Sequence, residues 1–224
     1  PGKHRLLRPV RRNTVLLTLA LVACSSRAPH RLVDRPRPKP PARALDAGRI
    51  VRVVLATADR RVSAAGDFDF YDEETGTRIG HGQRGETWRL ERERAGVRVR
   101  AVAIEGGTTA WTRAMSVTSA AILSIGLKKY RGRFVVLPVD SGLMVVNHLR
   151  VEDYLRGVVP LEIGKLAQRD SAAMQAQAVA ARSYAYVRLA DPIPRAFDLR
   201  PTTSDQVYGG FTAETEVAND AIDA

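Results

Sequence analysis

Residues 143–162 read LMVVNHLRVEDYLRGVVPLE, and an alanine-rich segment, SAAMQAQAVAARSYAYVRL, follows at residues 171–189. The first segment starts as an apolar, β-branched run typical of a strand and ends in a turn beside Glu162. The alanines of the second segment favour a helix and add little bulk, so they permit close packing. Asp170 or the next residue can cap this helix, and Pro192 ends it. We therefore predict a strand, a turn that carries a lone glutamate, and a long helix.

Short apolar runs separated by glycines precede this segment. Short alternating strands between glycine turns indicate a largely antiparallel β region. We expect strands at residues 50–55, 68–71, 87–90, 97–104, 121–127, 133–139 and 143–149. Residues 202–210 read as a loop with a short strand. The predicted fold class is α+β, with a β-rich antiparallel N-terminal region and an alanine-rich helix after the turn at Glu162.

The net charge of +11 comes almost entirely from the N-terminal residues 1–43. This segment holds eleven of the 35 lysines and arginines but one acid, Asp34, so the remainder carries 24 basic and 23 acidic residues. A nucleic-acid-binding fold normally carries its basic patch on the folded domain, because phosphate neutralisation supplies much of the affinity. The near-neutral body therefore disfavours a nucleic-acid partner.

The basic N-terminus leads into an apolar run at residues 14–23 that is too short to span a bilayer as a stable helix. It reads as a secretory signal peptide. Its end, Leu21-Val22-Ala23-Cys24, resembles a bacterial lipobox, in which the cysteine is lipidated and becomes the mature N-terminus. We expect an exported protein anchored by lipid at Cys24, in the outer membrane if the cell is diderm. The alternative is a chance apolar run beside a stray cysteine.

Five prolines alternate with arginine and lysine between Arg27 and Ala44. Proline removes backbone donors and like charges repel, so this segment is expected to be an extended tether. The predicted domains are a signal peptide (1–23), a lipidated cysteine with its tether (24–47), a β-rich region (48–127) and a C-terminal domain (128–224). The chain starts at Pro1 and stops inside a predicted helix, so we expect the C-terminal domain to be truncated.

Three motifs of the C-terminal domain resemble the SpoIID/LytB (stage II sporulation protein D) family. They are Val145–Leu155, the turn Gly157-Val158-Val159-Pro160-x-Glu162, and Ala176–Tyr184, and the pattern continues at residues 202–210. The resemblance implies an envelope enzyme that acts on peptidoglycan glycan strands as a lytic transglycosylase. The alternative that it leaves open is a non-catalytic peptidoglycan-binding module, or one that stimulates an N-acetylmuramoyl-L-alanine amidase.

Within this resemblance Glu162 is the catalytic acid. The apolar residues on either side of it, Val158 to Leu161 and Ile163, are expected to remove water from the carboxyl and keep it protonated. A lytic transglycosylase needs one carboxylate, because the muramyl C6 hydroxyl is the internal nucleophile and no water has to be activated. The alternative is an ordinary surface glutamate. Glu152 and Asp153 are interpreted as a strand end or a helix start rather than as a catalytic pair.

Gln175, Arg182 and Tyr186 share one face of the predicted helix. Arg182 could pair with Glu162, hold a muramyl carboxylate, or fasten the helix to the β region. The family often has Leu-Lys where this chain has Met174-Gln175, which removes one cation from the helix. Tyr184, Gln206 and Tyr208 are further candidates to bind the glycan, with ordinary packing as the alternative for the tyrosines.

His148 lies within the apolar strand at residues 143–149 and is interpreted as a hydrogen-bonded structural residue. Some relatives in the resembling family bind zinc through cysteine and histidine near the Gln-Val-Tyr motif. The corresponding residues here, Arg200 to Asp205, include neither type. We therefore expect no metal site of that kind and no cofactor.

Overall fold

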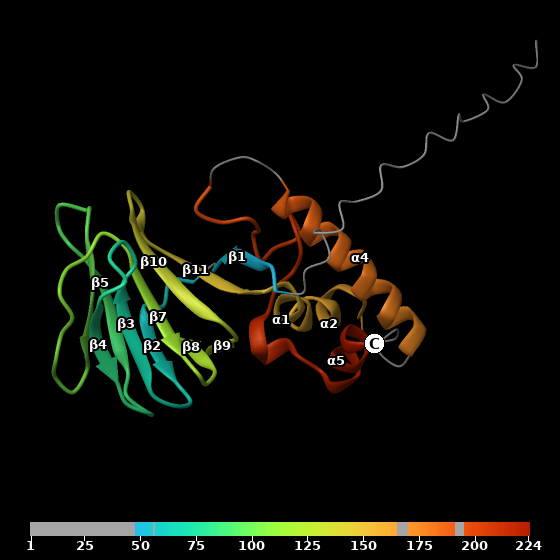
Figure 1. Ribbon diagram of the computed structural model, residues 1–224, viewed down its shortest axis with the longest axis horizontal. Helices are drawn as coiled ribbons and strands as arrows, with labels where there is room; N and C mark the ends of the chain where they lie inside the picture. Colours follow the sequence, from blue (N-terminus) through green and yellow to red (C-terminus); the bar gives the residue numbers. More distant parts are fainter. Residues whose placement is uncertain (1–47, 56, 165–169, 191–194) are drawn as a thin grey trace, which may run out of the picture. The chain divides into compact units, whose positions relative to one another are not determined.

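The computed structural model describes residues 48–55, 57–164, 170–190 and 195–224. These residues form two antiparallel sheets followed by helices (Figure 1). The predicted signal peptide, Cys24 and the tether lie outside the described residues, so those predictions stay predictions. The antiparallel strands and the later long helix confirm the α+β class.

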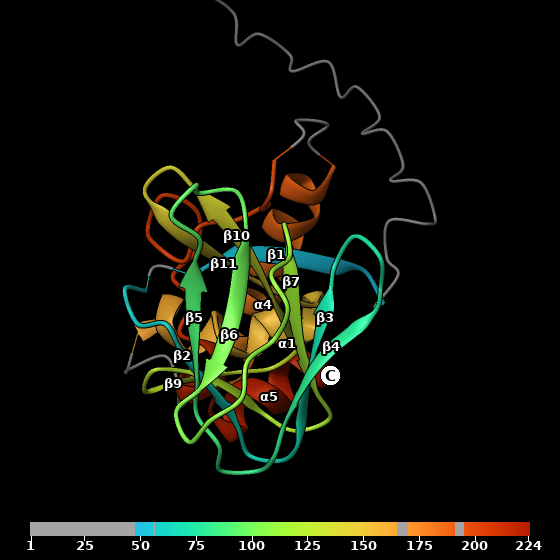
Figure 2. The same cartoon turned by 90° about the vertical axis from the view of Figure 1, so that its left-hand side faces the viewer.

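One sheet has six strands and the other has five, and every strand pair in both is antiparallel (Figure 2). The six-stranded sheet contains, in spatial order, β1 (Ile50–Val54), β11 (Gly142–Arg150), β10 (Arg133–Val139), β7 (Met115–Ser119), β3 (Phe68–Asp72) and β4 (Arg78–Gly82). The five-stranded sheet contains β6 (Val99–Ala103), β5 (Trp88–Arg92), β2 (Arg61–Ala64), β8 (Leu123–Ile125) and β9 (Lys128–Tyr130).

Buried aromatic side chains join the two sheets. Phe68 and Phe70 alternate with polar residues on β3, so both point to the same face. The Phe70 ring lies 4.8 Å from the Trp88 ring of β5, centroid to centroid. Since β3 belongs to the six-stranded sheet and β5 to the five-stranded one, this contact forms part of the core between them.

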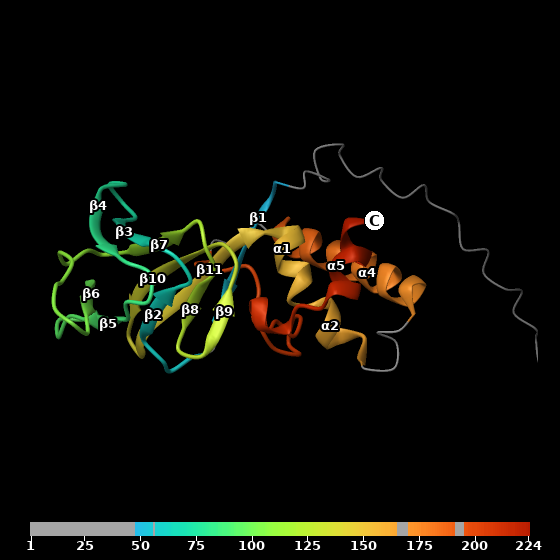
Figure 3. The same ribbon diagram turned by 90° about the horizontal axis from the view of Figure 1, so that it is seen from below.

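Strand β1 comes first in the described chain but pairs with β11, near the end of the β region (Figure 3). Val51 lies opposite Leu149, and both are buried. The Val151 N–H, at the start of the first helix, donates to the Arg49 carbonyl at 3.0 Å. The N-terminal strand therefore fixes the place where the sheet passes into the helices.

The helices are short except for one. They are α1 (Val151–Arg156), α2 (Val159–Glu162), α4 (Ser171–Leu189), the 3-10 turn η2 (Gly210–Ala213) and α5 (Glu216–Asp223). The buried face of α4 is made of Met174, Ala178, Ala181 and Ala185. The three alanine side chains are small and let α4 pack on α1, α2 and α5. Asp170 accepts a hydrogen bond from the Ala173 N–H at 3.1 Å, which confirms the predicted cap.

Helix α4 spans the predicted residues 171–189. The strands predicted at 133–139 and 143–149 are also confirmed, as β10 and β11. Four strands were not predicted. Strands β2, β4 and β7 are rich in serine, arginine or glycine and lack an apolar run, and β9 has only three residues, two of them lysines. The strand expected at 121–127 is shorter than predicted: β8 ends at Ile125, because Gly126 turns the chain with a φ of 59° into a hairpin with β9. The prediction of a short strand within residues 202–210 is wrong, since no strand forms there.

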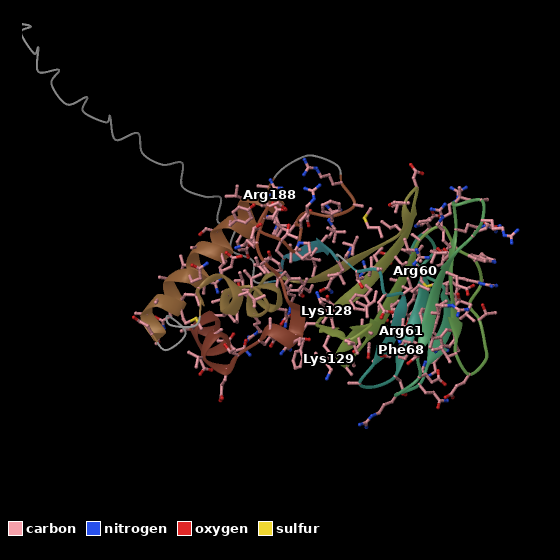
Figure 4. All side chains as sticks on the ribbon, turned by 180° about the vertical axis from the view of Figure 1, so that it is seen from behind. Arg60, Arg61, Phe68, Lys128, Lys129 and Arg188 are labelled. Atoms are coloured by element: carbon pink, nitrogen blue, oxygen red, sulfur yellow. The ribbon has the colours of Figure 1, made fainter. Side chains whose placement is uncertain are left out.

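The domain boundary predicted between residues 127 and 128 falls in the turn of this hairpin. Lys128 and Lys129 on β9 lie beside η2, and the Lys129 N–H donates to Thr212 Oγ1 at 3.2 Å (Figure 4).

None of the helices in the described ranges is long and apolar enough to cross a membrane.

Candidate functional site

A tight turn between α1 and α2 positions Glu162. Gly157 ends α1, and Pro160 lies in the first turn of α2, where its missing N–H leaves no hydrogen bond unmade. Val158 and Val159 are fully buried and anchor the turn to the core. Glu162 is the last residue of α2, and its side chain is exposed.

The loop at residues 206–209 packs directly on this turn. The Val207 N–H donates to Glu162 Oε1 at 2.6 Å, and the Gly209 N–H donates to the Gly157 carbonyl at 3.0 Å. A Cβ at Gly157 would come within 2.6 Å of the Tyr208 ring, so only glycine permits this approach. The loop therefore holds one oxygen of the Glu162 carboxylate in place.

Buried hydrogen bonds lie beneath the loop. The Tyr208 hydroxyl donates to Asn147 Oδ1 at 2.9 Å, and the Tyr154 hydroxyl donates to Gln206 Oε1 at 3.1 Å. Burial raises the pKa of both tyrosines, so each hydroxyl keeps its proton and remains a donor. These bonds connect the loop to α1 and to β11.

Asn147 is the residue of this site that sequence reasoning missed. It is fully buried on β11, and its Nδ2 donates to the carbonyls of Arg131 and Arg133 at 2.9 and 3.2 Å. The available signal was a single amide in the apolar run Leu143–Leu149. A buried amide is costly unless all its polar atoms are bonded, so it usually marks a specific network.

The apolar enclosure expected around Glu162 is wrong. In the single turn of α2 the side chains of Val159 and Pro160 point into the core, and Glu162 points away from it. The carboxylate is exposed and has the Val207 N–H as a partner. The arrangement leaves the second carboxylate oxygen open to a ligand that approaches from solvent.

The structure pairs Arg182 with Glu152 rather than with Glu162. Arg182 Nε and Nη2 lie 2.9 and 2.7 Å from the two Glu152 oxygens, and Nη2 also donates to the Ile222 carbonyl at 3.0 Å. The hydrogen bonds to Glu152 raise the pKa of Arg182. Arg182 thus fastens α4 to helices α1 and α5, whereas the fastening role considered from the sequence, as one of three alternatives, was to the β region. Because α1 begins at Val151, the interpretation of Glu152 and Asp153 as a helix start is confirmed.

The other residues predicted to bind the glycan lie on α4 or in the loop at residues 206–209. The Tyr184 hydroxyl donates to Asp205 Oδ1 at 2.9 Å, and Asp205, 4% exposed at its side chain, also pairs with Arg188 at 3.2 Å. Gln175 is exposed. Gln206 and Tyr208 are buried. The substrate-binding role expected for Gln175, Arg182, Tyr184, Gln206 and Tyr208 stays a prediction.

Residues 139–224 match the family model "SpoIID: Stage II sporulation protein". This part of the chain resembles a SpoIID domain, and we call it the SpoIID domain below. Over 98 residues the chain is 37% identical to an uncharacterized protein of Brachyspira hyodysenteriae. The matched stretch covers 42% of this chain and 26% of that relative. The chain thus spans about a quarter of the relative's length. No solved structure matches. The match to the SpoIID family points to a cell-wall-related role.

Arg182→Met is expected to lower the free energy of unfolding of the SpoIID domain by about 2 kcal/mol. The change leaves Glu152, whose side chain is 25% exposed, without its cation in a partly buried site. Chemical denaturation measures the loss. The matched control is Arg150→Met: Arg150 is 63% exposed and pairs with Asp153, so its removal should cost less than about 0.5 kcal/mol. Equal losses in the two variants would contradict the fastening role.

His148 is a hydrogen-bonded residue on β11 of the SpoIID domain, as expected from its place in an apolar strand. Arg133 Nη2 lies 3.4 Å from His148 Nδ1. Burial, followed by the charge of Arg133, lowers the pKa of His148 to about 4. Glu73, Arg52 and Asp198 are the other charged groups that act on it. His148 is therefore neutral in the folded protein at pH 7.

Acid is expected to destabilise the domain through His148. The unfolded imidazole titrates near its ordinary value of about 6.5 and the folded one near 4, so the unfolded state binds the proton first. The stabilisation is complete above pH 6.5 and is lost as the pH falls toward 4. Solvent screens the partly exposed ring, so we expect about 1–2 kcal/mol of this loss, less than the full pKa shift implies, to disappear in His148→Gln. Urea titrations of both proteins at pH 7 and pH 4 measure it, and identical pH dependence would exclude the effect.

In the described ranges, no three His, Cys, Asp or Glu side chains come together in a way that could hold a metal ion. The Arg200–Asp205 segment of the SpoIID domain instead forms a turn in which Asp205 Oδ2 accepts from the Arg200 N–H at 2.9 Å. Asp205 is thus used to shape the loop that leads to Val207.

Proposed function

We propose that this protein cleaves peptidoglycan glycan strands as a lytic transglycosylase and leaves 1,6-anhydromuramyl ends. The observation that carries the proposal is the Glu162 carboxylate, which is exposed at the end of α2 and held at one oxygen by the Val207 N–H. The SpoIID match over residues 139–224 includes both residues and supports the same conclusion.

Glu162 would act first as an acid and then as a base. It would protonate the glycosidic oxygen between N-acetylmuramic acid and N-acetylglucosamine while an oxocarbenium-like centre develops. The resulting carboxylate would then accept the proton of the muramyl C6 hydroxyl as that oxygen bonds to C1. A glycan strand lying over Glu162 would exclude water from the carboxyl and so favour the neutral acid needed for the first step.

The surrounding acids support a reaction with a single carboxylate. Glu152 makes a two-nitrogen ion pair with Arg182, and Asp153 pairs with Arg150 at 3.0 Å. Both Glu152 oxygens and one Asp153 oxygen are thus occupied by guanidinium groups, which leaves these carboxylates poorly placed to take a proton from an attacking water. An internal C6 hydroxyl needs no such base.

The direct test is to incubate the purified protein with peptide-free glycan strands and to look for 1,6-anhydro ends by mass spectrometry. Products with these ends are expected. Hydrolysed reducing ends alone would mean that water is the nucleophile, and intact strands would remove the enzymatic proposal.

A second candidate is a non-catalytic module that binds peptidoglycan or enhances an N-acetylmuramoyl-L-alanine amidase. The observation that favours it is the exposure of Glu162, which lines neither the cavity of about 460 Å³ nor that of about 320 Å³ in the described structure. This candidate predicts faster peptide release by an added amidase and no anhydro product. Adding a purified amidase to the same assay separates the two.

The proposed place of action is the bacterial cell envelope, with lipid at Cys24 as the anchor. Several acyl chains on one cysteine bind a membrane firmly, whereas a single chain holds only marginally. Cys24→Ser is therefore expected to move most of the protein from the detergent phase to the aqueous phase in a partition assay of expressing cells. Unchanged partition would show that another feature holds the protein at the membrane.

A further inference from the structure

A cavity of about 460 Å³ lies where β7, β10 and β11 meet the start of α1, apart from Glu162. Its polar wall contains Arg131, Arg133, His148, Arg150 and Asp153. Neither Glu162 nor the loop at residues 206–209 that contacts it lines this cavity. Most of this wall consists of hydrogen-bond donors.

The arginines are held in place from outside the cavity. Arg131 pairs with Glu214 through Nε and Nη2 at 2.6 and 2.8 Å, and Arg133 pairs with Glu73 through both Nη atoms at 2.7 and 2.9 Å. Neither Glu73 nor Glu214 lines the cavity. Such pairs fix the guanidinium planes before a ligand arrives, which reduces the entropy lost on binding.

Donors remain for a ligand. In the part of the chain that the structure describes, Arg150 uses only Nε for Asp153, and the side chains of Arg131 and Arg133 are 33% and 38% exposed. Arg133 has no acceptor atom, so His148 Nδ1 accepts from it and the imidazole proton lies on Nε2, a further donor. A wall of this kind matches an anion with several acceptor oxygens, and guanidinium groups bind carboxylates in a bidentate way.

The volume of the cavity and its apolar wall indicate which class of ligand it can bind. A simple inorganic anion would leave most of the cavity empty, whereas small-molecule sites typically have volumes of about 300–1,000 Å³. The apolar wall comes from Ile50, Ile122 and Leu149, and no Phe, Tyr or Trp side chain is among the described residues that line the cavity. Sugar rings are usually bound against aromatic faces, so aliphatic walls fit small aliphatic side chains better.

We propose that this cavity binds a short peptide that carries free carboxylates and small apolar side chains. The C-terminal carboxylate would lie between the arginines, and the side chains would lie against the aliphatic wall. Asn147 holds the backbone carbonyls of Arg131 and Arg133 and also binds Tyr208, next to the residue that contacts Glu162. The peptide site therefore shares a buried support with the candidate catalytic loop.

Isothermal titration calorimetry with the whole chain tests this proposal. The probe is alanyl-glutamyl-alanine with free carboxylates, and we expect saturable binding with a Kd below about 1 mM. The same peptide with its C-terminus amidated should bind about tenfold or more weakly. A stem peptide released from peptidoglycan is titrated in parallel to test whether the natural ligand comes from the cell wall. Tighter binding of the stem peptide than of the probe favours that source, and binding of either peptide supports a peptide site.

Two variants and one control separate the effect of charge on peptide binding from the effect of space in the cavity. Arg150→Gln should weaken binding about tenfold, whereas Arg89→Gln, which removes an equally exposed arginine from β5, should change it less than twofold. Ala120→Phe adds bulk at an exposed lining position, keeps every charge, and should abolish peptide binding. Equal binding of the acid and amide peptides, or inorganic phosphate binding as tightly as the probe, would overturn the proposal. Because binding is measured without glycan, neither result bears on transglycosylase activity.

Discussion

Glu162→Gln is expected to reduce glycan cleavage by about 10²-fold or more while the protein stays folded and still binds glycan. Glutamine keeps the size of the side chain, and its carbonyl oxygen can still accept from the Val207 N–H. It cannot deliver an acidic proton to the leaving oxygen or take one from the C6 hydroxyl. The initial rate of formation of 1,6-anhydro ends measures the loss, and the melting temperature checks the fold.

The matched control for this change is Glu216→Gln. Glu216 is an exposed glutamate in α5 and makes no side-chain hydrogen bond within the described residues. It should keep the parent rate, and Glu152→Gln should cost far less than Glu162→Gln if Glu152 only binds Arg182. Cleavage that survives Glu162→Gln would reject the assignment of this residue even if the enzyme class were right.

Gly132→Ala is expected to lower the free energy of unfolding by about 3 kcal/mol or more. Gly132 has a φ of 79°, and a Cβ there would overlap the His148 carbonyl and lie 2.7 Å from Leu149 Cβ. The carbonyl is part of the β11 backbone, which pairs on both sides with β1 and β10, so it cannot move without disturbing the sheet. Urea denaturation measures the change.

Gly76→Ala is the matched control for the backbone contribution. Gly76 has a similar φ of 70°, but a Cβ there would meet nothing within 4 Å. The positive φ alone should cost about 1 kcal/mol. The difference between the two variants therefore measures the close approach of Gly132 to β11. Equal losses would show that the contact can relax.

The parts of the fold with strong local signals could be predicted from the sequence. Helix α4 has a capping aspartate and many alanines, and β10 has an uninterrupted apolar run. Strand β7, MSVTS, could not be found in this way, because its place in the sheet depends on pairing with β3 and β10. Local sequence does not show which distant strand will supply those partners.

The candidate site was predictable only in part for the same reason. The place of Glu162 on a turn followed from its neighbours, but its exposure depends on which way a single helical turn faces. The partner of Arg182 was decided by how α4 packs on α1, so helical spacing alone could not choose between Glu152 and Glu162. Asn147 has all its described partners far away in the sequence.

The pairing of β1 with β11 also sets the order in which this protein can fold. Val51 must wait for Leu149, about 100 residues later, and synthesis of that length takes on the order of 5–20 s. Until then β1 has no partner in the sheet, and an unpaired strand can pair with another chain. Closing so long a loop also slows folding, because its entropy is lost before the contacts form. A fragment limited to the family match at 139–224 would lack β1 permanently, so it should aggregate where the longer chain folds.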